Sequence, residues 1–248
     1  MKQQQFLPTP HCPNSRVTHC AVGACYTDIH AALEQLGIYV LKIPQNPKIS
    51  RAVRYHADLQ IGIIKGDRIA VGKGETALKL RLEALDFHVD ESEHELCSDY
   101  PWEALLDFVS IDNQVIGNTQ IIGIEYSLKK SQMIHVNQGY AKCNMALLNN
   151  HAFITSDPSI ANTCRIHGFD VLQIKPGYIE LPGYSTGFIG GCCGLISPKQ
   201  LAVCGELQTH PDYNAIQDFL DKYQIETIEL CSGNLKDIGG IIPLKQTL

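Results

Sequence analysis

The chain has 248 residues, 44% of them apolar, so it can bury a sizeable core as one large domain or two small ones. Its formal net charge of −6 and its lack of any run of lysine or arginine argue against nucleic acid as a partner. No segment holds the roughly 18 apolar residues that a membrane span needs, and the N-terminus lacks the apolar core of a signal peptide. We therefore expect a cytoplasmic protein with no membrane partner, whose 10 cysteines are reduced thiols.

One supersecondary pattern recurs along the chain: an alternating strand, a tight turn, a second strand, a helix and a short third strand. Aligned on Cys20, Asp58, Asp107, Asn144 and Cys193, the copies lie roughly 40 residues apart. Units of this size bury a core only by packing together, so we expect them to form one domain. That domain spans residues 1–248, with repeats at 16–47, 55–95, 104–137, 140–176 and 187–231 and a closing strand at 237–244.

Capping residues support the helices of the later repeats. Asp157 precedes Pro158, and Thr209 precedes His210 and a proline, as expected where a side chain caps the first turn and proline occupies it. Gly168 follows the last helical residue of the fourth repeat, where a left-handed stop is expected. These signals predict helices that begin near 157 and 210.

The first strand of each repeat places polar or reactive residues on one face, because alternate residues of a strand face opposite sides. If these strands are arranged around an axis, that face lines a central channel, which is the usual place for a small-molecule site. A register slip of one residue would turn Cys143 and Cys192 inward instead. In the predicted register, the inward positions hold His56, Lys142 and Gly191, and two residues on, Asp58, Asn144 and Cys193.

Three segments resemble an uncharacterised bacterial family of the guanidino-group-modifying enzyme superfamily, also called the pentein superfamily. They are Asn137–Asn144, Leu181–Gly194 and Asp237–Gly240. Together with the repeats, the resemblance covers nearly the whole chain. It implies an α/β fold, a five-fold pseudo-symmetric, five-bladed α/β-propeller built from ββαβ-type repeats around a central channel.

The resemblance also implies a chemistry. Enzymes of this superfamily use a cysteine nucleophile, a histidine acid/base and carboxylates that grip the guanidinium. His56-Ala-Asp58 resembles the superfamily's His-x-Asp element. The chain departs from the pattern in its closing segment, where Asp237-Ile-Gly-Gly-Ile-Ile-Pro-Leu contains no cysteine, although the enzymes carry their nucleophile there.

The thiol at Cys193 is therefore the predicted nucleophile, with His56 and Asp58 as the other catalytic residues. The glycines on either side of Cys192-Cys193 allow close approach of the backbone, and a nearby cation would activate a thiol there.

Substrate-binding roles are predicted for residues beside glycine-rich turns and on the inward strand faces. Asp237 precedes the Gly239-Gly240 turn, and Tyr184 lies in a long glycine-rich loop. No cofactor and no metal site is predicted, because the chain has no phosphate-binding loop, dinucleotide fingerprint or Cys-x-x-Cys pair. The other predicted substrate-binding residues are Asn144, Lys142, Cys143 and Cys192.

Three functions stay open from the sequence. The first is a hydrolase or transferase that acts on a guanidino, amidino or related small nitrogenous compound in the channel. The second is a non-catalytic binder of a small molecule in the same channel, which the missing C-terminal cysteine favours. The third is a protein-interaction module of the same fold, for which a ribosome-binding translation factor is the precedent.

Overall fold

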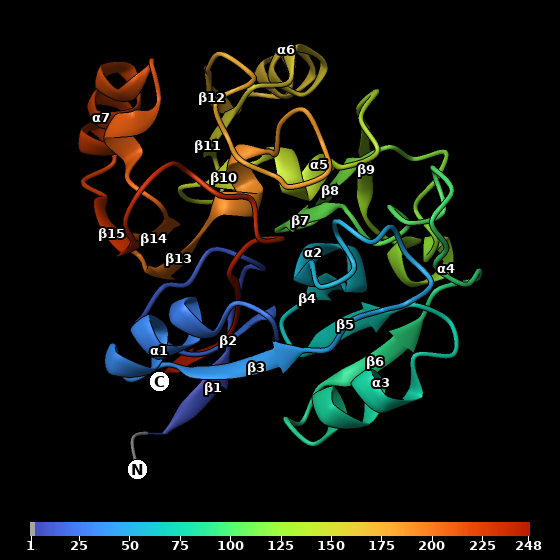
Figure 1. Ribbon diagram of the computed structural model, residues 1–248. Coiled ribbons are helices and arrows are strands. Elements are labelled where there is room, and N and C mark those ends of the chain that lie inside the picture. Colours follow the sequence, from blue (N-terminus) through green and yellow to red (C-terminus); the bar gives the residue numbers. More distant parts are fainter. Residues whose placement is uncertain (1–2) are drawn as a thin grey trace.

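The computed structural model describes residues 3–248, and this part of the chain contains five small β-sheets (Figure 1). In the first sheet a strand from the C-terminal end of the chain pairs antiparallel with two strands from the N-terminal end. The predicted closing strand begins at Ile242, not at 237. The strand order of this sheet is β1 (Gln4–Phe6), β16 (Ile242–Thr247), β2 (Val17–Gly23) and β3 (Tyr39–Ile43).

The other four sheets share one plan. In each, the first two strands form an antiparallel hairpin, and the third pairs parallel with the second. The strands are β4 (Ile61–Lys65), β5 (Arg68–Val71) and β6 (His88–Glu91); β7 (Val109–Ile111), β8 (Gln114–Gly117) and β9 (Gln132–His135); β10 (Ala146–Leu147), β11 (Ala152–Thr155) and β12 (Asp170–Gln173); β13 (Cys193–Ser197), β14 (Gln200–Cys204) and β15 (Glu226–Cys231).

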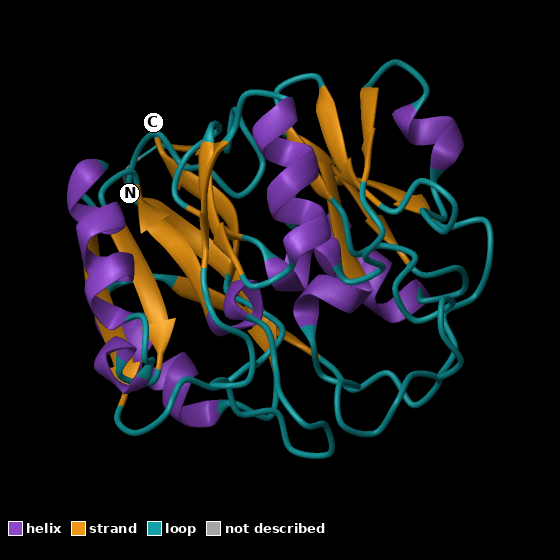
Figure 2. Cartoon of the chain, turned by 90° about the horizontal axis from the view of Figure 1, so that it is seen from above, coloured by secondary structure: helices purple, strands orange, loops and turns teal. Residues whose placement is uncertain are grey.

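A helix precedes the third strand of every sheet, since parallel neighbours need a crossover connection. The longer helices lie at the periphery, and in a view from above they flank the tilted strands (Figures 1 and 2). Asp157 caps the fourth of these helices by accepting a hydrogen bond from Ile160 N at 2.9 Å, as its sequence predicted. The helices are α1 (Thr27–Gln35), α3 (Thr76–Glu83), α4 (Glu125–Leu128), α6 (Pro158–Ile166) and α7 (Tyr213–Lys222).

Two sequence predictions are corrected at the ends of these elements. The last helix begins at Tyr213, because residues Leu207–Thr209 form a 3₁₀ turn, η2, before it. The strands predicted from 56, 142 and 191 begin later, because short helical turns precede them. These turns are α2 (Ala57–Gln60), α5 (Ala141–Asn144) and the 3₁₀ turn η1 (Ile189–Cys192).

This correction changes which side chains face the centre. Successive residues of a helix point about 100° apart, so alternation between two faces no longer applies. The turns α2 and α5 lie near the middle of the molecule (Figure 1). Their polar residues are buried, so their directions are set by contacts with distant segments and not by strand register.

The apolar core is divided among the interfaces between successive sheets. Ile154 of β11 and Leu201 of β14 lie in one buried cluster, and Val109 of β7 and Phe153 of β11 lie in another. Successive sheets thus bury apolar residues against each other. Within residues 3–248, none of the helices is long and apolar enough to cross a membrane.

Candidate active site

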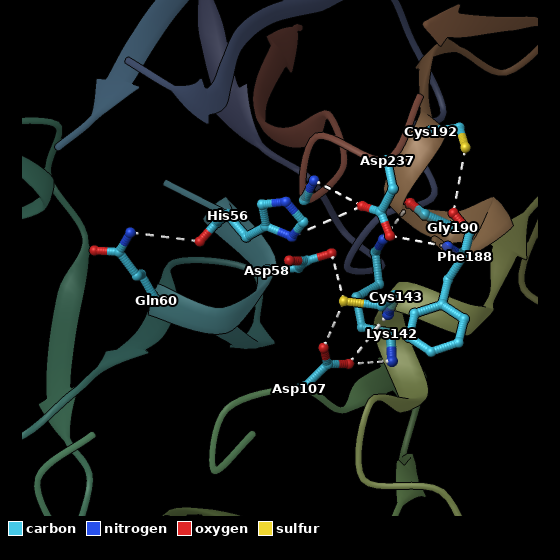
Figure 3. A network of polar contacts seen from close by, with 11 residues as sticks. His56, Asp58, Gln60, Asp107, Lys142, Cys143, Phe188, Gly190, Cys192 and Asp237 are labelled. Atoms are coloured by element: carbon cyan, nitrogen blue, oxygen red, sulfur yellow. Dashed lines mark hydrogen bonds and ion pairs between the residues drawn. The ribbon is translucent and has the colours of Figure 1, made fainter. Parts of the chain in front are cut away.

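Polar side chains from three distant segments meet around the turns α2 and α5 (Figure 3). Asp58 lies on α2, Cys143 on α5, and Asp107 just before β7. Asp107 Oδ1 accepts hydrogen bonds from the backbone N–H groups of Lys142 and Cys143, the latter at 3.1 Å. These are free donors of the first turn of α5, so Asp107 holds this turn in place. In the same way, Asp58 N donates to Gly239 O at 3.2 Å and ties α2 to the C-terminal segment.

The thiol of Cys143 lies between two carboxylates. Its Sγ is 2.8 Å from Asp107 Oδ2 and 3.0 Å from Asp58 Oδ2, and all three side chains are buried. A thiol has one hydrogen, so it donates to only one carboxylate at a time. The other carboxylate then needs a proton or a cation, because an unpaired buried charge is costly. The site therefore favours cations over neutral molecules.

A third carboxylate, that of Asp237, belongs to the same network of polar contacts (Figure 3). Its Oδ2 accepts from Phe188 N at 2.9 Å and its Oδ1 from Gly239 N at 3.0 Å. His56 Nδ1 is 3.7 Å from Asp237 Oδ1, an ion pair when the imidazole is protonated. His56 Nε2 is buried without a partner among the described residues, so it can form a hydrogen bond with a ligand. Gly191 packs so closely on Asp237 that a Cβ there would overlap the carboxylate.

Two adjoining cavities reach these groups. An inner cavity of about 80 Å³ is lined by Cys143, His56 and Asp237 and by the rings of Tyr140 and Phe188. A larger outer cavity of about 910 Å³ shares Asp237 with it, and both cavities are lined by Leu181 and Tyr184. The inner cavity suits a small planar group, and the outer one can hold the remainder of a larger molecule.

Burial has the largest effect on the pKa values of the carboxylates and the thiol discussed here. Burial and the neighbouring Asp58 raise the pKa of Asp107 well above its usual range. Burial also raises the pKa of Asp237, and the His56 imidazole opposes this shift. Burial, together with Asp107 and Asp58, raises the pKa of the Cys143 thiol well above its ordinary value. The resting group is therefore a thiol that needs a base or a bound cation before it can act as a nucleophile.

The raised pKa of Asp107 predicts a pH-dependent stability. A carboxyl whose pKa is higher in the folded state stabilises the fold when protonated, and that stabilisation is lost as pH rises from the ordinary value through the folded one. Asp107→Asn cannot ionise and keeps an oxygen for the α5 amides. As pH rises within this window, the unfolding free energy of Asp107→Asn should therefore increase relative to that of wild type by up to ~1.4 kcal/mol per pH unit.

Urea unfolding of both proteins at intervals from pH 4 to pH 8 measures this difference. The exposed Asp218→Asn serves as the control, and its curve should run parallel to wild type. A constant difference between wild type and Asp107→Asn at every pH would contradict the assignment.

The structure does not bring all the sequence-predicted residues together. His56, Asp58, Asp237 and Cys143 meet at the site, with Tyr184 at the wall of both cavities. Tyr184 is 47% exposed, and its hydroxyl donates to Ser50 Oγ at 3.1 Å.

The remaining predicted residues have other contacts. Lys142 Nζ donates to Gly190 O at 3.2 Å, and Asn144 Nδ2 donates to Tyr140 O at 2.8 Å. Both thus fasten the backbone around α5. The thiols of Cys192 and Cys193 donate to backbone carbonyls of the same 3₁₀ turn, those of Phe188 and Ile189. Burial raises the pKa of Cys193 to about 12, and neither His56 nor Asp58 is among its contacts.

Several residues of the site were not predicted to be functional. Asp107 was aligned with Asp58 by the repeat, and this correspondence was the signal for it. Tyr140 and Phe188 line the inner cavity, and the Tyr140 hydroxyl donates to the buried carboxylate of Glu103. Tyr140 and Phe188 lie within the segments Asn137–Asn144 and Leu181–Gly194, but nothing in those segments singles them out as cavity residues. Contacts between segments far apart in the chain bring them together with Glu103 and the site.

The carboxylates and the thiol could also hold a metal ion. Ligand atoms of Asp58, Asp107 and Cys143 all lie within 4.8 Å of one another. Two carboxylates and a thiolate are a suitable donor set for zinc. The same cluster thus offers its negative charge to a proton, a metal ion or an organic cation.

The fold is that of the pentein superfamily. A similar solved structure is the inosamine-phosphate amidinotransferase from Streptomyces griseus, with a TM-score of 0.61, 11% sequence identity and a match over 98% of both chains. The amidinotransferase SxtG from Microseira wollei, in the saxitoxin pathway, has a TM-score of 0.56 and 10% identity over 93% of this chain and 91% of that one. DDAH from Pseudomonas aeruginosa, a cysteine-to-serine mutant complexed with citrulline, has a TM-score of 0.56 and 9% identity over 94% of this chain and 100% of that one.

The chain belongs to a family of unknown function (DUF6873), whose model matches residues 22–242. A comparison with curated proteins gave no match.

Proposed function

We propose that this protein is a hydrolase or transferase that acts on a guanidino or amidino compound, with Cys143 as its nucleophile. The observation that carries this proposal is the single buried thiol held between two carboxylates at the wall of a small cavity. Cys143 replaces Cys193 in this role, because the structure surrounds Cys143 with groups that can take its proton. The amidinotransferases among the structural neighbours support the same class of substrate.

Binding of the substrate rests on charge and shape. An amidinium or guanidinium is planar and cationic, and carboxylates bind such groups by charge-assisted hydrogen bonds. Asp237 offers its carboxylate at the wall of the inner cavity, and the rings of Tyr140 and Phe188 offer faces for a cation. The outer cavity then holds the rest of the substrate.

The chemical step follows from the same contacts. The thiol proton passes to Asp58 or Asp107, and the sulfur electron pair forms a C–S bond to the electron-poor guanidinium carbon. The C–N bond to the leaving amine breaks, and the amine takes the bonding pair and a proton from His56. Water or an acceptor amine then gives a proton to His56 and attacks the carbon, the C–S bond breaks, and the sulfur takes back the proton from Asp58 or Asp107. The bound cation favours the thiolate, which offsets the high pKa of Cys143.

We also infer that the five sheets form a closed, five-fold pseudo-symmetric propeller around this site. A site enclosed in this way takes a small molecule as its ligand. Contacts of β4 with β7, of β10 with β13 and of β13 with β16 support this arrangement. Asp58, Asp107 and Cys143 all lie in or beside the segments that lead into first strands, as a shared central site requires.

A pair of alkylating probes tests the proposal. 2-Chloroacetamidine is cationic, and 2-chloroacetamide is its neutral counterpart with the same leaving group. Alkylation of all 10 cysteines is followed by peptide mass spectrometry, with each rate divided by that of glutathione with the same probe. Cys143 should prefer the amidine over the amide by ~10- to 100-fold, the equivalent of one or two charge-assisted hydrogen bonds.

The controls separate binding from ordinary thiol reactivity. Exposed Cys25 should show no preference, and Cys143→Ser should remove the fast amidine reaction without raising that of Cys193. If Cys193 were the thiol that the amidine labels selectively, the assignment of Cys143 would be wrong. If no cysteine preferred the amidine, the guanidino function itself would be refuted.

A further inference from the structure

Two cysteines that the proposed chemistry does not use lie together in the wall of the outer cavity. Cys204 ends β14 and Cys231 ends β15, and both line the cavity of about 910 Å³. Cys204 is fully buried, whereas Cys231 is half-buried. Both are free thiols in this structure.

An irregularity in the sheet places the two cysteines opposite each other. β14 and β15 pair in parallel register up to Val203 and Glu229, and the register then shifts so that Cys204 pairs with Cys231. Without this shift, Cys204 would face Leu230 and Cys231 would lie one position further on. Neighbouring strands lie about 4.8 Å apart, and Cα separations of about 4.4 to 6.8 Å suit a disulfide.

The Cys231 thiol lies close enough to Cys204 to affect its ionisation. The backbone N–H of Gly205, the residue after Cys204, lies close enough to the Cys231 thiol to lower its pKa. Burial raises the pKa of Cys204 well above its usual range, and the neighbouring Cys231 raises it further. Burial raises the pKa of Cys231 as well, but the nearby Lys236 ammonium opposes that shift. Cys231 is thus the more accessible and more readily ionised thiol of the pair.

We propose that Cys204 and Cys231 are a redox-active pair that forms a reversible disulfide across β14 and β15. With a peroxide as oxidant, the Cys231 sulfur attacks one peroxide oxygen, which gives a sulfenic acid and releases water or an alcohol. The Cys204 sulfur then attacks the Cys231 sulfur, a second water leaves, and the disulfide forms. A dithiol reductant returns both thiols. The bond would lock the two strands together at the cavity wall.

Peptide mapping tests this pairing in the intact protein. The folded chain is treated with one equivalent of hydrogen peroxide, blocked with N-ethylmaleimide and digested with trypsin without reduction. Residues 200–222 contain Cys204 as their one cysteine, and residues 223–236 contain only Cys231. The expected product is these two tryptic peptides joined by a disulfide, at least tenfold more abundant than any other cross-link. Dithiothreitol should remove it, and unfolding in urea before oxidation should abolish its excess.

Variants identify the order of events. Cys231→Ser should prevent the cross-link, and Cys204→Ala should leave a sulfenic acid at Cys231 that dimedone captures. Cys25→Ser is the matched control, because Cys25 is exposed and close in sequence to the cavity residues Tyr26 and Asp28, and it should cross-link like wild type. The proposal is overturned if Cys231 joins Cys25, or if the folded protein oxidises at Cys231 to sulfinic acid with Cys204 still reduced.

Discussion

Replacing Asp237 by alanine is expected to lower the amidine preference of Cys143 by ~10- to 100-fold, because Asp237 is the carboxylate that lines both cavities. The same change leaves the N–H groups of Phe188 and Gly239 without their acceptor. Each such donor costs ~1–3 kcal/mol, so for the two we expect a loss of about 2–6 kcal/mol in the free energy of unfolding.

Asp237→Asn separates these two effects. Asparagine has nearly the same size and retains an oxygen acceptor, so it should destabilise the fold less than alanine does. It carries no charge, so the amidine preference should fall almost as far as in the alanine variant. Alkylation rates with both chloro compounds and urea unfolding measure the two quantities. An unchanged amidine preference in Asp237→Asn would show that Asp237 does not bind the cation.

Gly191→Ala is expected to destabilise the fold strongly. Its Cβ would overlap the carboxylate of Asp237, which backbone hydrogen bonds hold in place, so one of the two segments must shift. Overpacking of this kind costs ~1–3 kcal/mol or more. Urea unfolding should show this loss, and the displaced carboxylate should also reduce the amidine preference of Cys143.

Two comparisons identify the cause of that loss. Gly177→Ala adds a methyl group where no atom lies within 4 Å, at a φ of +100°, and therefore measures backbone strain alone. It should cost less than Gly191→Ala. The double variant Gly191→Ala, Asp237→Ala should lose less unfolding free energy than the sum of the two single losses, because removal of the carboxylate makes room for the methyl group. Full additivity would contradict the steric explanation.

The recurring elements could be predicted from the sequence, because local patterns decide them. Apolar alternation fixes hairpins such as β13–β14, and the Asp157-Pro158 cap fixes the start of α6. The same patterns failed just before the first strands, where α5 occupies residues predicted to be extended. Asp107, which lies 35 residues before Lys142, holds that turn by accepting its N–H groups. No local pattern records a contact of this kind.

Only part of the candidate site could be predicted, because local patterns do not record contacts between distant segments. His56 and Asp58 were selected because they fall on the predicted channel face and resemble a His-x-Asp element, and Asp237 because it precedes a glycine turn. Cys143 was expected to face away, since strand alternation placed Lys142 and Asn144 inward. A helical turn removes that alternation, and the Cys143 thiol meets the carboxylates while Lys142 reaches a carbonyl of the next sheet's leading turn.

The position of β16 between β1 and β2 has a consequence for how the protein folds. Cys20 pairs with Pro243 in that sheet, and Asp58 is held by Gly239, so contacts that span most of the chain complete both the first sheet and the site. Closing such long loops is slow and entropically costly. During synthesis, four sheets can form as their residues leave the ribosome, but the first waits for the last segment. Its apolar face stays open until then, which makes this stage of biogenesis the one most exposed to aggregation.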